Sequence, residues 1–248
     1  GNIHMLTAYQ VSSDETLDIP SGKEVNIIRD KPFSSLNLGS DEVTKNPMFK
    51  ITGGEFVVNA ADQGSSITFD GNNVEITEII NGGAFNISGD TTQLTLKGAE
   101  GKKNIIIKKN VLTKTNGDAS DVDSMGGCGG GICIQSSNKK HTITSCDFNN
   151  NKAAAIGGGF MNYTDEDTLE ITNCSFTKNV VPNGIGGGLF IGGKTEKNDI
   201  FASLANCSTS RLFNTERFNT TFSFNTLSKQ LLSNITNLLI IKTEDSIK

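Results

Sequence analysis

Three carboxylates, Asp118, Asp121 and Asp123, lie close together in a polar stretch of this 248-residue chain. Carboxylate and carbonyl oxygens are the ligands that Ca²⁺ prefers, and one ion takes about six to eight of them. The spacing of the three side chains does not match that of an EF-hand loop. We therefore treat them as the candidate ligand-binding residues, with Ca²⁺ as the single cofactor that they suggest. Solvated turn residues are the alternative interpretation.

A second acidic group, Asp165, Glu166 and Asp167, also lies in a polar loop. Polysaccharide cleavage would need paired carboxylates with a histidine, or a Ca²⁺-binding carboxylate group with a basic residue. His141 occupies in its repeat the position that Leu169 holds in the next, so we expect it to be a structural residue at a corner of the chain. No catalytic residue is assigned, and an enzyme is the less favoured hypothesis.

The chain has five cysteines, Cys128, Cys133, Cys146, Cys174 and Cys207. The first two have no matching His or Cys pair at the spacing of a zinc site, so no metal centre is expected. Cys146 and Cys174 hold equivalent positions in successive repeats. Stacked repeats about 4.8 Å apart would bring them within disulfide range. We favour the alternative, in which both are buried thiols that pack as small apolar side chains.

A short phrase recurs along the chain: two glycines, one variable residue, then apolar residues at alternate positions. Its first apolar residues are Phe56, Phe85, Ile132, Phe160 and Leu189, at intervals of 29, 47, 28 and 29 residues. A period of this length indicates a solenoid, in which each repeat packs on the next. The longest interval contains an insertion, which falls on the polar stretch between Asn116 and Cys128. Long loops on a repetitive scaffold often carry binding, so this insertion is the expected contact site.

Two successive repeats align residue by residue, with Ile143 matching Ile171 and Phe148 matching Phe176. Each repeat contains three short runs of period two: after the glycines, at residues 141–144 and around Phe148. Three short strands per turn predict an all-β fold, a parallel β-helix of about six coils. We expect the glycines to stand where a side chain would clash with the next coil.

The repeat also predicts which side chains stack inside the solenoid. The five apolar residues that follow the glycine pairs are expected to form one inward column, and Val58, Ile87, Ile134 and Ile191 a second, with Asn162 as its polar exception. Strand alternation then places Met161 on the outer side, next to inward Phe160. Asn110, Asn151 and Asn179 are expected to stack at one corner and to exchange amide hydrogen bonds.

Three segments follow from these patterns. Residues 1–20 are expected to form an N-terminal lead-in or cap, residues 21–200 the β-helix, and residues 201–248 a C-terminal cap or a tail without regular structure. The spacing of Leu231, Ile235 and Leu239 is that of an amphipathic helix, which would cover the end of the solenoid.

Composition excludes several classes of function. The formal net charge is −5, and no basic stripe exists to neutralise phosphates, so no nucleic-acid partner is expected. No window of about 20 apolar residues occurs, so no transmembrane segment is expected in this chain. The sequence also shows no signal-peptide pattern at its start.

The glycine phrases and the Phe-x-x-Asn phrases together resemble the polymorphic membrane protein family of autotransporter passengers. The matching pieces are Gly82 to Phe85, the three Gly-Gly-Gly-apolar phrases, and the phrases that begin at Phe69, Phe148 and Phe176. One departure is that glycine replaces alanine in most repeats. The resemblance implies a secreted or cell-surface right-handed β-helix, an adhesin-type passenger displayed at an outer membrane. Its partner would be a host-cell or surface receptor or a glycan.

Two other functions stay open at this point. One is a carbohydrate-active β-helix enzyme, a polysaccharide lyase or hydrolase that uses loop carboxylates. The other is a purely structural spacer. Release of new sugar ends from polysaccharides would distinguish the enzyme from the adhesin.

Overall fold

The computed structural model describes residues 1–30, 44–117, 125–136, 139–164 and 168–193, and beyond these the backbone of four short strands within residues 201–223. Three parallel sheets of seven strands each dominate this part of the chain. Sheet A contains β1 (Asn2–Met5), β4 (Glu24–Arg29), β7 (Ser66–Asp70), β11 (Ile105–Lys108), β15 (Cys146–Asn149), β18 (Ser175–Thr177) and β21 (Ser208–Thr209). Sheet B contains β2 (Tyr9–Val11), β5 (Phe49–Ile51), β9 (Phe85–Ser88), β13 (Ile132–Gln135), β16 (Phe160–Thr164), β19 (Leu189–Gly193) and β22 (Leu212–Asn214). Sheet C contains β3 (Glu15–Asp18), β6 (Glu55–Ala60), β10 (Gln93–Gly98), β14 (Lys140–Thr144), β17 (Thr168–Thr172), β20 (Phe201–Ala205) and β23 (Thr221–Ser223).

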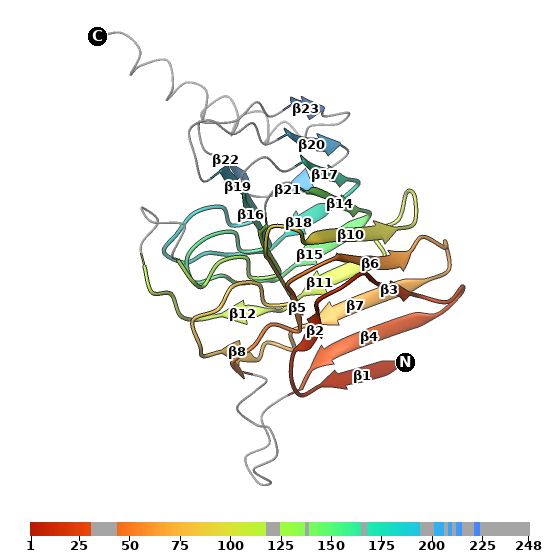
Figure 1. Cartoon of the computed structure of the whole chain (residues 1–248), viewed down its shortest axis with the longest axis horizontal. Coiled ribbons are helices and arrows are strands. Elements are labelled where there is room, and N and C mark those ends of the chain that lie inside the picture. Colours follow the sequence, from red (N-terminus) through yellow and green to blue (C-terminus); the bar gives the residue numbers. More distant parts are fainter. Residues whose placement is uncertain are drawn as a thin grey trace.

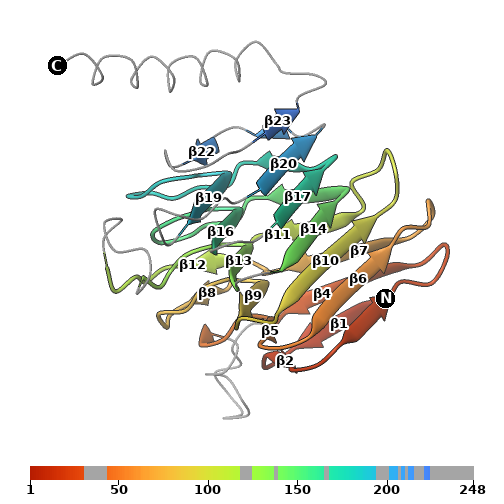
Figure 2. The same cartoon turned by 45° about the horizontal axis from the view of Figure 1, so that its top comes forward.

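The chain visits sheets A, B and C in turn and then returns to A, so every strand pairs in parallel with its equivalents one turn earlier and later. Figures 1 and 2 show these turns stacked in sequence order, from the red N-terminal strands to the blue strands β20, β22 and β23. A small two-stranded sheet, β8 (Glu75–Ile76) with β12 (Val111–Leu112), joins the long connections from A to B. The prediction of an all-β structure built from parallel sheets is confirmed.

The solenoid extends beyond both predicted boundaries. Residues 1–20 do not form a separate lead-in or cap, because β1, β2 and β3 pair with β4, β5 and β6 as the first strands of the three sheets. The prediction of about six coils begins at residue 21 and does not include this turn. After residue 200, β20 pairs with β17 and β22 with β19. Parallel pairing needs only an extended backbone, so it continues where the glycine phrase has ended. The helical pattern of residues 227–239 lies outside the described residues.

The predicted inward column is correct for four members and wrong for one. Phe85, Ile132, Phe160 and Leu189 are in register in sheet B. Phe56 belongs to sheet C, where it pairs with Leu94, and Phe49 takes the expected place beside Phe85.

Val58 is displaced from its predicted column for the same reason. It pairs with Leu96 in sheet C, and Ile51 takes its place beside Ile87. The glycine pair before Phe56 stands at the bend before sheet C, not at the bend before sheet B. At that bend a Cβ on Gly54 would overlap the backbone of Ser13.

Apolar side chains fill the interior, as the period-two pattern predicts. Phe148 and Phe176 stack with ring centroids 4.6 Å apart and planes at 8°. Phe69 and Phe85 meet edge to face at 4.6 Å, which links the columns of sheets A and B. Asn162 is the polar exception in its column, in register with Ile134 and fully buried. Offset and edge-to-face contacts of this kind add to the stabilisation from burial.

A ladder of buried asparagines runs along the corner that follows sheet A, as predicted. Asn110 Nδ2 donates to Asn151 Oδ1 at 3.0 Å, and Asn151 Nδ2 donates to Asn179 Oδ1 at 3.0 Å. Asn151 Nδ2 also donates to the carbonyl oxygen of Ile107, and Asn179 Nδ2 donates to that of Phe148. The ladder therefore satisfies backbone groups that the bend withdraws from sheet pairing.

The glycine phrases before sheet B let successive coils touch through their backbones. The Gly130 amide donates to the carbonyl oxygen of Gly157, and the Gly158 amide donates to that of Gly186, both at 3.0 Å. A Cβ on Gly158 would overlap the carbonyl oxygen of Gly187. Only glycine permits this approach, which confirms the predicted reason for the repeat.

A second apolar cluster covers the outer side of sheet B. Met161 does not face solvent as the alternation predicts; it is fully buried, and its Sδ lies 3.9 Å from Cys133 Sγ. The A-to-B connections supply the covering side chains. The cluster contains Met125, Cys128, Cys133, Ala155, Ile156, Met161 and Phe190. Sheet B is therefore packed on both faces at β13, β16 and β19, where its outer positions take apolar residues as well.

Candidate functional site on the outer face of sheet C

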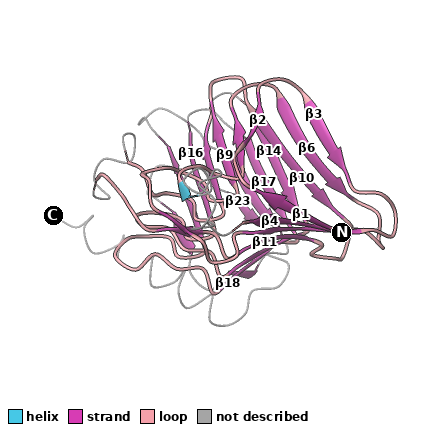
Figure 3. Ribbon diagram, turned by 90° about the horizontal axis from the view of Figure 1, so that it is seen from below, coloured by secondary structure: helices cyan, strands magenta, loops and turns pink. Residues whose placement is uncertain are grey.

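Sheet C presents an open face of the solenoid. Along each of its strands, apolar side chains that point into the core alternate with polar side chains that point to solvent, which is the pattern of a sheet covered on one face only. The outward side chains are half-buried or exposed: Glu55, Val57, Asn59, Gln93, Thr95, Lys97, Lys140, Thr142, Thr144, Thr168, Glu170 and Thr172. Figure 3 shows the strands of this sheet side by side along one flank of the molecule.

Hydrogen bonds between neighbouring strands hold several of these side chains in place. Glu55 Oε1 accepts from Gln93 Nε2 at 2.9 Å and from Thr95 Oγ1 at 2.7 Å. Lys140 Nζ lies 3.2 Å from Glu170 Oε2 one coil further on. The face is therefore an ordered array of donors and acceptors, spaced by the distance of about 4.8 Å between parallel strands.

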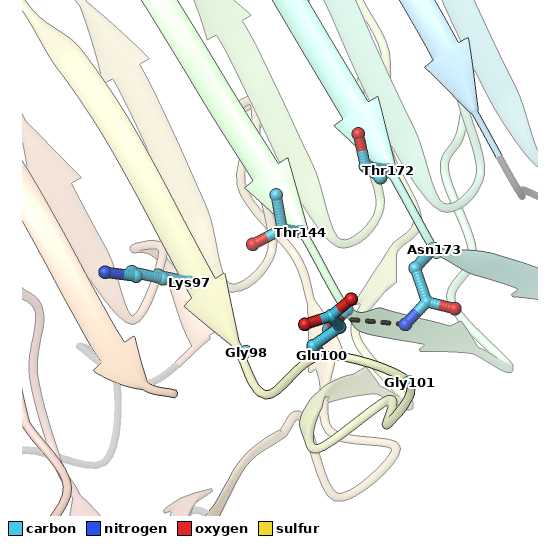
Figure 4. Close-up of a pocket in the computed structure, with 8 residues that line it drawn as sticks. Lys97, Gly98, Glu100, Gly101, Thr144, Thr172 and Asn173 are labelled. Carbon is cyan, nitrogen blue, oxygen red and sulfur yellow. Dashed lines mark hydrogen bonds between the residues drawn. The ribbon is translucent and has the colours of Figure 1, made fainter. Parts of the chain in front are cut away.

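A groove of about 410 Å³ lies where the strands of sheet C end. It is lined by Lys97, Gly98, Glu100, Gly101, Thr144, Ser145, Thr172 and Asn173. Figure 4 shows Thr144 and Thr172 at the ends of their strands, with Glu100 on the neighbouring loop. Asn173 Nδ2 donates to the carbonyl oxygen of Lys102 at 2.7 Å and to Ser145 Oγ at 3.0 Å, which fixes the floor of the corner.

A second groove, of about 350 Å³, lies at the opposite edge of the sheet, where the strands begin. Its lining is polar and consists of Asp14, Gly54, Glu55, Thr91, Gln93 and Lys139. The Glu55 amide donates to Asp14 Oδ1 at 2.8 Å, so the two carboxylates come from neighbouring coils at one corner. Two carboxylates therefore line this groove.

The acidic residues identified from the sequence, Asp118, Asp121 and Asp123 and those at 165–167, lie outside the described residues. The flanks of the insertion are described: Asn116 Oδ1 accepts from the Gly126 amide at 2.7 Å. This bond closes the base of the insertion, on the A-to-B side of the solenoid and away from the outer face of sheet C.

His141 has the structural role expected for it, but it lies inside a strand in the core and not at a corner. It lies in β14 in register with Leu169 and is fully buried. Its Nδ1 accepts from the Leu94 amide at 3.1 Å, so the proton is on Nε2, which contacts Ser136 Oγ at 2.8 Å. An Nε2 that already carries its proton cannot take one from a serine hydroxyl. This Ser–His contact is therefore not an activated nucleophile.

The four described cysteines, Cys128, Cys133, Cys146 and Cys174, are buried free thiols, so the interpretation favoured above agrees with the structure. Burial raises the pKa of the Cys128 thiol to about 12 and that of Cys133 well above its ordinary value. Within the described ranges, no group of three or more His, Cys, Asp and Glu side chains is arranged to hold a metal ion. In the same part of the chain, no helix is long and apolar enough to cross a membrane.

Comparisons with protein-family models, with curated proteins and with solved structures find no match to this chain. The outer face of sheet C was not singled out from the sequence, although a signal for it exists. Polar residues alternate with buried apolar ones in Gln93–Gly98, Lys140–Thr144 and Thr168–Thr172, but assigning a common face needs the register between strands.

Proposed function

We propose that this protein is a non-enzymatic, secreted or cell-surface β-helix module of the adhesin or passenger type, which binds a host-cell or surface receptor or a glycan. The observation that carries the proposal is the open outer face of sheet C, a polar array with a groove at each edge. The resemblance of the glycine and Phe-x-x-Asn phrases to autotransporter passengers supports the same class and the same location.

A stacked solenoid suits this function because it fixes its surface before any partner arrives. The buried columns, the asparagine ladder and the glycine contacts hold each coil against the next. Binding groups on such a surface lose little conformational freedom when a ligand arrives, and this lowers the cost of association. The insertion after Asn116 is a second proposed contact, on another side of the same scaffold.

The finer features of the solenoid belong to this proposal. We take the winding to be right-handed, because connections between parallel strands of one sheet are right-handed in nearly all proteins. We also keep about six coils for the part that carries the glycine phrases and their upstream equivalents. A helix over residues 227–239 would cover the C-terminal end, where the last strands leave unpaired edges.

One observation favours a second function, a carbohydrate-active enzyme. Asp14 and Glu55 line the same groove, and paired carboxylates are the usual machinery of glycoside cleavage. Glu55 Oε1 accepts two hydrogen bonds, from Gln93 and Thr95, so this carboxylate already holds side chains of the neighbouring strand.

The proposal is tested by measuring binding and catalysis on the same preparation of the full chain. Labelled protein is applied to cultured host-type cells, to extracellular matrix proteins and to immobilised glycans, and it is also incubated with neutral and acidic polysaccharides. Saturable binding without release of reducing or unsaturated sugar ends is expected. Repeated release of such ends, abolished by Glu55→Gln, would establish the enzyme instead, and no saturable binding on any surface would refute the module.

A further inference from the structure

We propose that the ligand of this module is a neutral oligosaccharide that lies along β10 on the outer face of sheet C, with its ends in the two grooves. This inference rests on the proposed binding function and specifies its ligand and its site. It is carried by three observations: the position of the grooves, the chemistry of the side chains between them, and the balance of charge.

The two grooves lie at opposite ends of the same strand. Gln93, the first residue of β10, lines one groove, and Lys97 and Gly98, the last two residues, line the other. A strand of six residues spans about 17–20 Å, which is the scale of a short sugar chain rather than of one sugar ring. A single extended ligand that follows β10 would therefore enter both grooves.

The side chains between the grooves are short and carry hydroxyl groups. Thr95 is the middle outward residue of β10, and Thr142 is its partner on the next strand, in register. We call the outward surface that runs from Glu55 past Thr95 and Thr142 to Thr144 the track. A threonine hydroxyl can donate and accept a hydrogen bond, as a sugar hydroxyl can, so the two surfaces are complementary.

The ends of the track supply fixed polar groups. Glu55 holds Gln93 and Thr95 through one carboxylate oxygen, and this orients the three side chains before binding. At the other end, Thr144 Oγ1 donates to the carbonyl oxygen of Leu96 at 3.1 Å, so its lone pairs are free to accept from a sugar hydroxyl. Preset donors and acceptors reduce the ordering cost of binding.

The charges around the track favour a neutral ligand. The acidic residues of the two grooves are Asp14, Glu55 and Glu100, and the basic ones are Lys97 and Lys139. Both signs occur in each groove, so neither end forms a basic field for a polyanion such as a sulfated or uronic-acid polysaccharide. A polycation would meet a lysine at each end. A polyhydroxylated chain without charge remains as the matching class.

The test uses the full chain on an array of neutral glycans, such as xylan, mannan and β-glucan oligosaccharides, together with heparin, polygalacturonate and sialylated glycans. Thr95→Arg places a bulky side chain on the track, and Thr177→Arg places the same side chain on an exposed position of sheet A. We expect saturable binding to at least one neutral glycan. Thr95→Arg should lower that binding at least tenfold, whereas Thr177→Arg should leave it unchanged. Circular dichroism and the unfolding midpoint confirm that each variant is folded, and Thr142→Arg replaces Thr95→Arg if the latter does not fold.

The outcomes separate this inference from the function on which it rests. Binding to acidic glycans alone, or neutral-glycan binding that Thr95→Arg does not change, would overturn the inference. Binding to a cell or matrix protein with no glycan bound would also overturn it, while the binding function would stand. If the chain binds neither glycans nor cells nor matrix proteins, both the function and the inference are wrong.

Discussion

The asparagine ladder allows a sharp test of what holds the coils together. Asn151 is its middle member and is fully buried. Replacing it with alanine removes four hydrogen bonds: its amide to Asn179 Oδ1 and to the carbonyl of Ile107, and its Oδ1 from the side-chain amide and the backbone amide of Asn110. The Ile107 carbonyl and the Asn110 backbone amide then lose these partners inside the protein.

The magnitude follows from the groups that are left unpaired. Each buried polar group without a partner costs about 1–3 kcal/mol, so Asn151→Ala should lower the free energy of unfolding by about 3–5 kcal/mol. Asn110 is the matched comparison, because it ends the ladder and its Oδ1 has no hydrogen-bond partner within the described part of the chain. Asn110→Ala removes two bonds from its side-chain amide, one to Lys108 and one to Asn151, and should cost about 1–2 kcal/mol.

Urea unfolding followed by circular dichroism measures the difference, with Asn149→Ala as a control on the outward side of β15. The expected order of destabilisation is Asn151, then Asn110, then Asn149, whose side-chain contact is to exposed Asn150. Equal midpoints for the Asn151 and Asn110 variants would refute the reasoning. A loss below about 1 kcal/mol for Asn151→Ala would refute it too, because it would mean that the unpaired groups find other partners.

Three further predictions follow from the packing. Met161→Ala should lower the free energy of unfolding by about 2–5 kcal/mol, close to the effect of Phe160→Ala, since both side chains are fully buried. If urea unfolding gives a loss for the Met161 variant below half of that for the Phe160 variant, the second cluster is open to solvent. Gly158→Ala should prevent or severely weaken folding, whereas Gly117→Ala should be nearly neutral, because the nearest atom that a Cβ there would meet among the described residues is Met125 Cγ, at 4.0 Å. Equal expression and equal melting temperatures of the two variants would contradict the role given to the glycines. Burial raises the pKa of the Cys128 thiol to about 12, while an unfolded thiol ionises near 8.5. Between these pH values the unfolded chain binds fewer protons than the folded protein. The free energy of unfolding therefore falls with rising pH, by up to about 1.4 kcal/mol per pH unit. Cys128→Ala should therefore reduce the loss of stability between about pH 8 and pH 10.5, and an unchanged slope would show that the thiol ionises in the folded protein.

Much of the fold could be predicted because each coil of a solenoid repeats the sequence pattern of the coil before it. The matches of Ile143 with Ile171 and of Phe148 with Phe176 are the register of adjacent strands in the structure. The asparagine ladder follows from the same alignment. The glycine phrase alone does not identify the sheet that follows it: Gly54 stands before sheet C and not sheet B, so the predicted column is wrong for Phe56.

The open face and the second cluster could not be predicted because they depend on what covers each sheet. Strand alternation shows that Met161 and Thr95 both point away from the main core. It does not show that connecting loops bury Met161 and leave Thr95 half-exposed. Coverage is set by the path of the A-to-B connections. The two grooves could not be predicted for the same reason, because the one at the strand ends joins residues from three coils and the one at the strand starts joins residues from four.

Lysine footprinting tests most directly whether the outer face of sheet C binds the partner. The full chain is acetylated with and without saturating neutral oligosaccharides from the array, and the modified lysines are quantified by mass spectrometry. The account predicts protection of Lys97 and Lys139, which line the two grooves, and unchanged labelling of Lys114 beside the insertion and of Lys108 on sheet A. Protection of Lys114 with unchanged labelling of Lys97 would contradict it and would place the binding site on the insertion.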